Sequence, residues 1–177
     1  MASSLAAACT ASAENEGSLI TRIFAECQEM EPEFAGTDQG AVVIVPEVGS
    51  LDLHMMASST ESFAMCTHSG AGTSLSKVPY GLASAEEDVI GQMLTGTIPN
   101  KVSTGHGTRV WGTRVAAEVA AAELVVVANG RSVRGVVAAG TVLFGIPVED
   151  AGDDYVKDGY RVVAKDKAGA VVYDDLI

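Results

Sequence analysis

The sequence ELVVVANGRSVRGVVAAGTVLFGIPVED occupies residues 123–150 and alternates short valine-rich runs with glycine-containing turns. Asn129-Gly130 separates two of the runs, and an Asn-Gly pair between apolar runs is a strong hairpin signal because its turn positions favour positive φ. Ala139-Gly140 separates the next two. The runs have the length and β-branched content of strands, at residues 123–128, 133–137 and 141–147.

The same pattern continues on both sides of this segment. Further valine-containing runs lie at 108–116, 160–165 and 170–174, with Asp158-Gly159 and residues 167–169 as turns. Short strands at near-regular spacing predict a mostly β protein, a small β-barrel or β-sandwich. The core is expected to contain large apolar residues from these runs and from one upstream run: Val43, Val125, Val127, Val142, Phe144, Val162 and Val172.

Two short helices are expected in the N-terminal half. Apolar residues recur at nearly 3.6-residue spacing over residues 18–30, Ser18 suits an N-cap, and Pro32 ends the pattern. A second helix is expected to begin at Ser84, with an acidic residue at the third helical position, and to run to about Leu94.

Strands and loops fill the rest of this half. The run AVVIV at 41–45 predicts a buried strand, and weaker strands are expected at 51–57 and 62–68. The small polar residues of 69–77 predict a flexible loop, as do those of 95–107.

The expected organisation is a single β-rich domain over 18–177, with a subdivision near the 69–107 loop region left open. Residues 1–17 are rich in Ala, Ser and Thr and predict a flexible arm. Such an arm buries too little apolar area to offset its ordering entropy, so we expect it to order only in an assembly. Residues 1–9 faintly resemble a lipoprotein signal, but they lack a basic segment and a long enough apolar stretch.

Charge and composition exclude several classes of partner. The chain of 177 residues has a formal net charge of −12 and no cluster of basic residues, which disfavours binding to nucleic acid or to anionic lipid. No apolar run reaches the ~20 residues of a membrane span. The cysteines, Cys9, Cys27 and Cys66, are odd in number and widely spaced, so we expect no disulfide framework and a reducing, cytoplasmic rather than secreted, environment.

Candidate site residues are few. His54, His68 and His106 together with Cys66 contain metal-ligating atoms, but they lack the spacing of a zinc site. Cys66 and His68 would share a face of a strand and could act as nucleophile and base, although neither an orienting third group nor an oxyanion hole can be named. We therefore assign no catalytic, cofactor-binding or metal-binding residue.

Other suggestive segments fail the same kind of test. The glycine-containing loops at 69–73 and 104–108 lack the lysine and the spacing of phosphate-binding loops. The acidic cluster at 149–154 lacks the bidentate glutamate of a calcium loop. Four arginines in the strand-rich region are expected to form local salt bridges: Arg109, Arg114, Arg131 and Arg134.

The stretch Glu123–Lys167, with the segments ELVVVANGRSVRGV and GTVLFGIPVEDAGDD and the closing hairpin YRVVAKDKAG, resembles the β-rich core of tailed-phage head decoration, or cement, proteins. The resemblance implies a non-enzymatic structural subunit on the capsid surface of a virion, in contact with coat or shell subunits. It also implies a homo-oligomer, with a trimer favoured. The alternatives are a small enzyme using Cys66 and His68, or a β-barrel that binds a small ligand.

Overall fold

The computed structural model describes residues 4–47, 50–59, 61–79, 94–96, 108–147 and 159–176. These residues form one α-helix, one short 3-10 helix and twelve strands. In chain order they are α1 (Ser4–Met30), η1 (Pro32–Phe34), β1 (Gln39–Glu47), β2 (Ser50–Ser58), β3 (Ser62–Ser69), β4 (Gly72–Pro79), β5 (Leu94–Gly96), β6 (Thr108–Arg114), β7 (Ala121–Val126), β8 (Ser132–Arg134), β9 (Val136–Ala138), β10 (Thr141–Pro147), β11 (Tyr160–Lys165) and β12 (Val171–Leu176).

The strands form three antiparallel sheets of four strands each. The first sheet has the order β1-β2-β3-β4, the middle sheet β5-β6-β10-β9 and the last sheet β12-β11-β7-β8. The mostly β prediction is confirmed. The barrel alternative is wrong, because each sheet is open at both ends of its strand order.

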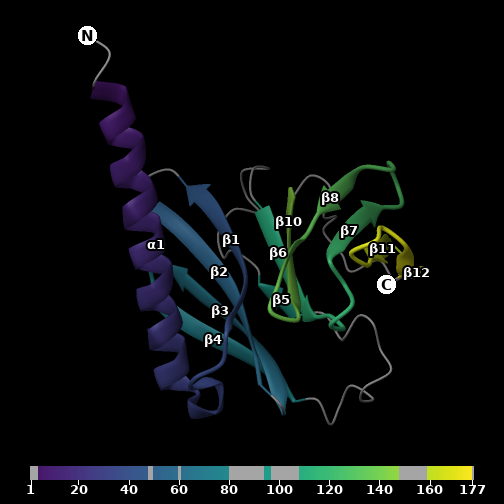
Figure 1. The fold of residues 1–177 in the computed structure, drawn as a ribbon, viewed down its shortest axis with the longest axis horizontal. Coiled ribbons are helices and arrows are strands. Elements are labelled where there is room, and N and C mark those ends of the chain that lie inside the picture. The colour runs from purple at the N-terminus through teal and green to yellow at the C-terminus, as the bar shows by residue number, and fades with distance from the viewer. Residues whose placement is uncertain are drawn as a thin grey trace.

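Helix and sheets stack as four layers, with α1 at one end and the last sheet at the other (Figure 1). Ile23 and Cys27 of α1 pack on Leu53 and Met55 of the first sheet. Apolar side chains of the opposite face of the first sheet, such as Met56, pack on the middle sheet. A third apolar layer lies between the middle and last sheets. The first and middle sheets are thus covered on both faces.

Strand β10 shows how the sequence produces this stack. Successive side chains of a strand point to opposite faces. Val142, Phe144 and Ile146 pack against the last sheet, whereas Leu143 packs against the first. All four are fully buried, which explains why this run is apolar at consecutive positions.

The predicted core is right in part. Val142, Phe144 and Val162 are fully buried, and Val43, Val125 and Val172 are half-buried. Val127 is 51% exposed, so its assignment to the core was wrong. The alternation in β7 points Leu124 and Val126 inward, and Val125 and Val127 therefore face outward.

The strand predicted at 133–137 is two strands in two different sheets. β8 pairs with β7 in the last sheet, and β9 pairs with β10 in the middle sheet. The chain passes from one sheet to the other at Gly135, where a Cβ would lie 2.6 Å from Val142 and 2.7 Å from Phe144. Only glycine fits this close approach, because any other side chain would displace the core.

The two Gly-containing turns differ in length. Ala139 and Gly140 form a two-residue turn between β9 and β10, and both have positive φ, 45° and 70°. The Asn129-Gly130 pair instead lies in a longer loop, closed by a 2.8 Å hydrogen bond from the N–H of Val126 to the carbonyl of Arg131, and Gly130 alone of the pair has positive φ.

The first helix ends at Met30, as predicted, but it begins at Ser4 rather than Ser18. Alanine has the highest helix propensity, so the Ala-rich segment assigned to a flexible arm continues the helix. The N-terminal end of α1 extends beyond the strands of the first sheet (Figure 1).

The loop predicted at 69–77 is wrong, since β4 occupies most of it and pairs with β3 through a tight turn at Gly70 and Ala71. Leu75 is the one large apolar residue of this segment, so its alternation was hard to recognise. The loop predicted at 95–107 is also wrong at its first two residues, which belong to β5. The helix predicted from Ser84 lies outside the described residues, except for Leu94 at the start of β5.

Candidate functional site

Cys66 and His68 share the helix-facing side of β3, as predicted for residues two apart on a strand. Cys66 is joined to Cys27 of α1 by a disulfide, with a Cα–Cα distance of 6.2 Å. The expectation of no disulfide was therefore wrong. The available signal was Cys27 itself, which lies one turn after Ile23 on the apolar face of the helix. In this bond Cys66 has no thiolate to act as a nucleophile.

His68 belongs to a chain of polar contacts between sheet and helix. Its Nδ1 lies 2.9 Å from Oγ1 of Thr73, and the Thr73 hydroxyl donates a 2.6 Å hydrogen bond to Oε2 of Glu26. The hydrogen bond from Thr73 lowers the pKa of the Glu26 carboxyl. These polar contacts hold the β3–β4 hairpin against α1, and they give His68 a hydrogen-bond partner within the protein.

His54 points to the opposite side of the first sheet, toward the middle sheet. It is 1% exposed, and its Nδ1 lies 3.2 Å from Oγ1 of Thr67. Its Nε2 has no hydrogen-bond partner among the described residues. Burial lowers the pKa of His54 to about 4, so the imidazole is neutral near pH 7.

The proposed metal ligands do not converge. His54 and His68 lie on opposite faces of the first sheet, Cys66 is bonded to Cys27, and His106 lies outside the described residues. Within the described part of the chain, no three His, Cys, Asp or Glu side chains are grouped to hold a metal ion.

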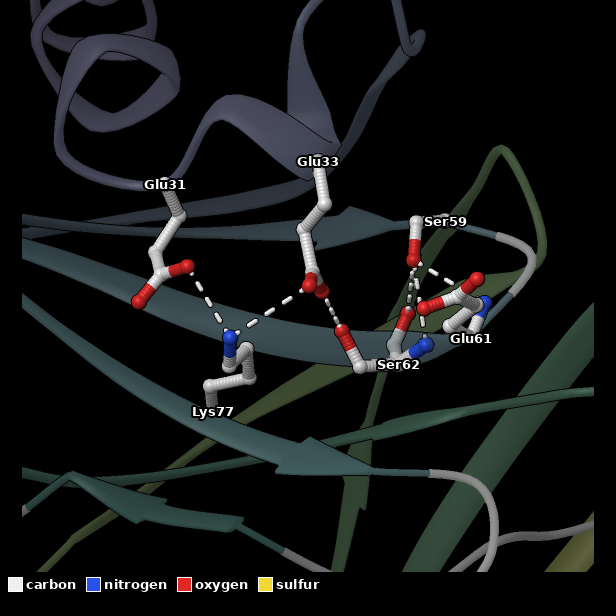
Figure 2. Close-up of polar contacts among 6 residues, drawn as sticks. All are labelled: Glu31, Glu33, Ser59, Glu61, Ser62 and Lys77. Atoms are coloured by element: carbon white, nitrogen blue, oxygen red, sulfur yellow. Dashed lines mark hydrogen bonds and ion pairs between the residues drawn. The ribbon is translucent and has the colours of Figure 1, made fainter.

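A second polar cluster holds the end of the helix on the first sheet (Figure 2). Nζ of Lys77 lies 2.9 Å from Oε2 of Glu31 and 3.3 Å from Oε2 of Glu33, and the Ser62 hydroxyl donates to Oε1 of Glu33. Ser59 accepts the backbone N–H of Ser62 at 3.0 Å. The hydrogen bond from Ser62 lowers the pKa of Glu33, and the hydrogen bond to Glu31 raises the pKa of Lys77. Each charged group has a partner within the protein, so the cluster is structural.

The outer face of the last sheet, on the side away from the middle sheet, is the main exposed apolar surface among the described residues. Val127, Val171 and Leu176 are 51%, 53% and 48% exposed there, and Val125 and Val163 are half-buried. Strand register places Leu176 opposite Arg161, and Val125 on the other side of Arg161. Val125, Val127 and Leu176 line a shallow apolar hollow beside Arg161 and Gly130.

Charges of both signs surround the apolar residues of this face. Arg161 and Asp174 form a bidentate ion pair, with both N–O distances at 2.5 Å. Its hydrogen bonds raise the pKa of Arg161 and lower that of Asp174. Glu123 and Arg134 are register partners, and both border a second hollow with Lys165. The face is thus close to neutral in a chain of net charge −12.

Two of the arginines expected to form local salt bridges lie in different sheets. Arg114 belongs to β6 of the middle sheet, whereas Arg134 lies on the outer face of the last sheet. This face could not be recognised from the sequence while Val125 and Val127 were assigned to the core. One signal could have corrected the assignment of Val125 and Val127 to the core. It was the alternation along β11, in which Tyr160 and Val162 are buried and Arg161 is exposed.

No helix within the described residues has both the length and the apolar character needed to cross a membrane. Comparison with protein-family models, with curated proteins and with solved structures finds no match to this chain.

Proposed function

We propose that this protein is a non-enzymatic structural subunit, a decoration or cement protein that binds coat or shell subunits on a virion surface. The observation that carries the proposal is the exposed apolar outer face of the last sheet. Val127, Val171 and Leu176 are about half exposed to solvent, and they lie on strands or directly after one. Side chains exposed at such positions are usually polar. An apolar group rimmed by charges is typical of a protein contact surface.

The polar clusters support a structural rather than a chemical role. His68, Glu26, Glu33 and Lys77 are all engaged in contacts that join α1, or the η1 segment after it, to the first sheet. Cys66 is held in a disulfide. These groups stabilise the stack of layers, and the stack presents the outer face of the last sheet as a rigid surface.

The test uses virus particles sedimented from the material in which this protein occurs. The proposal predicts that the chain sediments with the coat protein at a fixed ratio, and that purified chain rebinds to particles stripped with mild denaturant. The variant Val127→Asp should rebind poorly. Val136→Asp is the matched control, because Val136 is a similarly exposed valine, at 44%, on β9 of the middle sheet. Absence of the chain from the particles, or equal rebinding of both variants, would refute the proposal.

A further inference from the structure

We infer that the outer face of the last sheet binds the same face of a second copy of this chain, as a two-fold symmetric dimer of packed sheets. The inference rests on the proposed function, because it takes this face as the contact surface, and it names what covers the face in the free protein, before a coat or shell subunit takes the place of the second copy. The distribution of charge on this face supports the dimer, and the available area sets its strength.

Charge distribution favours a second copy at this face over one at the helix end. The opposite end of the stack, α1 and η1, presents mainly carboxylates among its described side chains: Glu16, Glu26, Glu29, Glu31 and Glu33, with Arg22 and Lys77 as basic partners. Two such ends repel each other. The outer face of the last sheet instead carries Arg134, Arg161 and Lys165 beside Glu123 and Asp174. In a two-fold contact each surface meets its own copy, so a face with both signs can complement itself.

The apolar residues of the face fit the same arrangement. Sheets pack face to face about 10 Å apart with interdigitating side chains. Val125, Val127, Val163 and Leu176 lie on one side of three neighbouring strands or directly after them, in positions to fill such a layer. The exposed valines and leucine of one copy would then lose their water contact against those of the other.

The available area predicts a weak dimer. Three strands of six residues and one of three, at about 3.3 Å per residue and about 4.8 Å apart, give a four-stranded face of roughly 330 Å² per copy. Two copies would together bury less than the ~1,200 Å² that stable interfaces bury. Interfaces of this smaller size are typical of transient contacts. We therefore expect monomer and dimer to exchange in the micromolar to millimolar concentration range.

Sedimentation velocity of the purified full-length chain over this concentration range tests the inference. The mass should rise from monomer to dimer and stop there. Val127→Asp and Leu176→Asp should each raise the dissociation constant by at least about tenfold, whereas Val136→Asp should leave it unchanged. Because all three sites are about half exposed, circular dichroism and melting should show that the variants stay folded.

The failures can be told apart. The inference is overturned if the wild-type chain stays monomeric or forms a trimer. It is also overturned if the Val127→Asp variant dimerises as tightly as the wild type. If the wild-type chain still sediments with particles, the proposed function stands. A dimer that is abolished by Val127→Asp supports the inference even where the chain is absent from particles, and in that case the proposed function is the part that fails.

Discussion

The backbone N–H of Ala41 donates a 2.9 Å hydrogen bond to Oγ1 of Thr141, a residue 100 positions away in the chain. The Thr141 hydroxyl donates in turn to the carbonyl of Ala138 at 2.8 Å. Thr141 is fully buried, and a Cβ on Gly40 would collide with its Oγ1. This hydroxyl therefore links β1 of the first sheet to β10 of the middle sheet at a point where their backbones approach closely.

Replacing Thr141 with valine should destabilise the protein by about 1–3 kcal/mol, because the shape is kept while the buried N–H of Ala41 loses its acceptor. Thr141→Ser keeps the hydroxyl and should lose clearly less. Denaturant unfolding of both variants measures the difference. Equal losses for valine and serine would contradict the prediction, because valine lacks only the hydroxyl and serine lacks only the methyl group.

Replacing Ala139 with asparagine should stabilise the protein. Ala139 has φ of 45°, a left-handed conformation that costs a residue with a Cβ roughly 1 kcal/mol, whereas asparagine tolerates it and Asn-Gly is the preferred two-residue turn. The expected gain is about 0.5–1 kcal/mol, seen as a higher unfolding midpoint. Ala168→Asn is the control, since Ala168 is an exposed turn residue without positive φ. Equal gains in both variants would contradict the explanation.

His54 should make the protein less stable in mild acid. Its pKa is about 4 in the folded protein, because burial disfavours the charged imidazole, against an ordinary value of 6.5. Below pH 6.5 the unfolded chain binds a proton that the folded chain does not, so stability falls as the pH drops from 6.5 to 4, by up to about 3 kcal/mol.

The variant His54→Gln cannot titrate and should show a shallower loss of stability over the same pH range. Above pH 7 the stabilities of variant and wild type should run parallel. Urea unfolding at a series of pH values measures both. An imidazole resonance of His54 that titrates near 6.5 by NMR would contradict the prediction.

The Cys27–Cys66 disulfide should contribute substantially to stability. It closes a loop with a sequence separation of 39, for which the chain-entropy relation gives about 3–4 kcal/mol. The double variant Cys27→Ala, Cys66→Ala should therefore melt lower than wild type, and Cys9→Ala should not. Without reductant, denatured wild type should show one reactive thiol. Three reactive thiols would show that the bond is absent in the purified protein.

Deleting residues 1–15 should leave the melting temperature nearly unchanged. Among the described side chains of α1, packing on the first sheet begins at Leu19 and continues through Ile20, Ile23 and Phe24. Melting of the shortened chain, with particle rebinding measured in parallel, tests whether the segment acts in an assembly. A drop of many degrees would show that residues 1–15 belong to the core.

Sequence patterns predicted the strands well where turns were marked by glycine. β10 and β11 have the predicted bounds because Gly140 and Gly159 precede them and each contains a short run of apolar residues. β4 was missed because Leu75 gives its polar sequence little periodicity. The assignment of Val127 to the core was wrong because ELVVV has apolar residues at both odd and even positions of the strand. Only packing in three dimensions decides which of the two sets is buried.

The candidate contact surface was less accessible to prediction than the strands. It combines β7, β11 and β12, and β11 pairs with both of the other strands, with Val163 opposite Glu123 on one side and Asp174 on the other. The Cys27–Cys66 bond similarly depends on α1 lying across β3. Such contacts join segments far apart in the chain, and no local spacing encodes them.

The crossing at Gly135 makes the middle and last sheets depend on each other for folding. The segment that contains β8 and β9 contributes a strand to each, so neither sheet is complete without the other. The first sheet uses four strands that follow one another in the chain and pair through short connections. We therefore expect its hairpins to form early, even during synthesis, whereas the two later sheets close together as one cooperative unit after β12 is made.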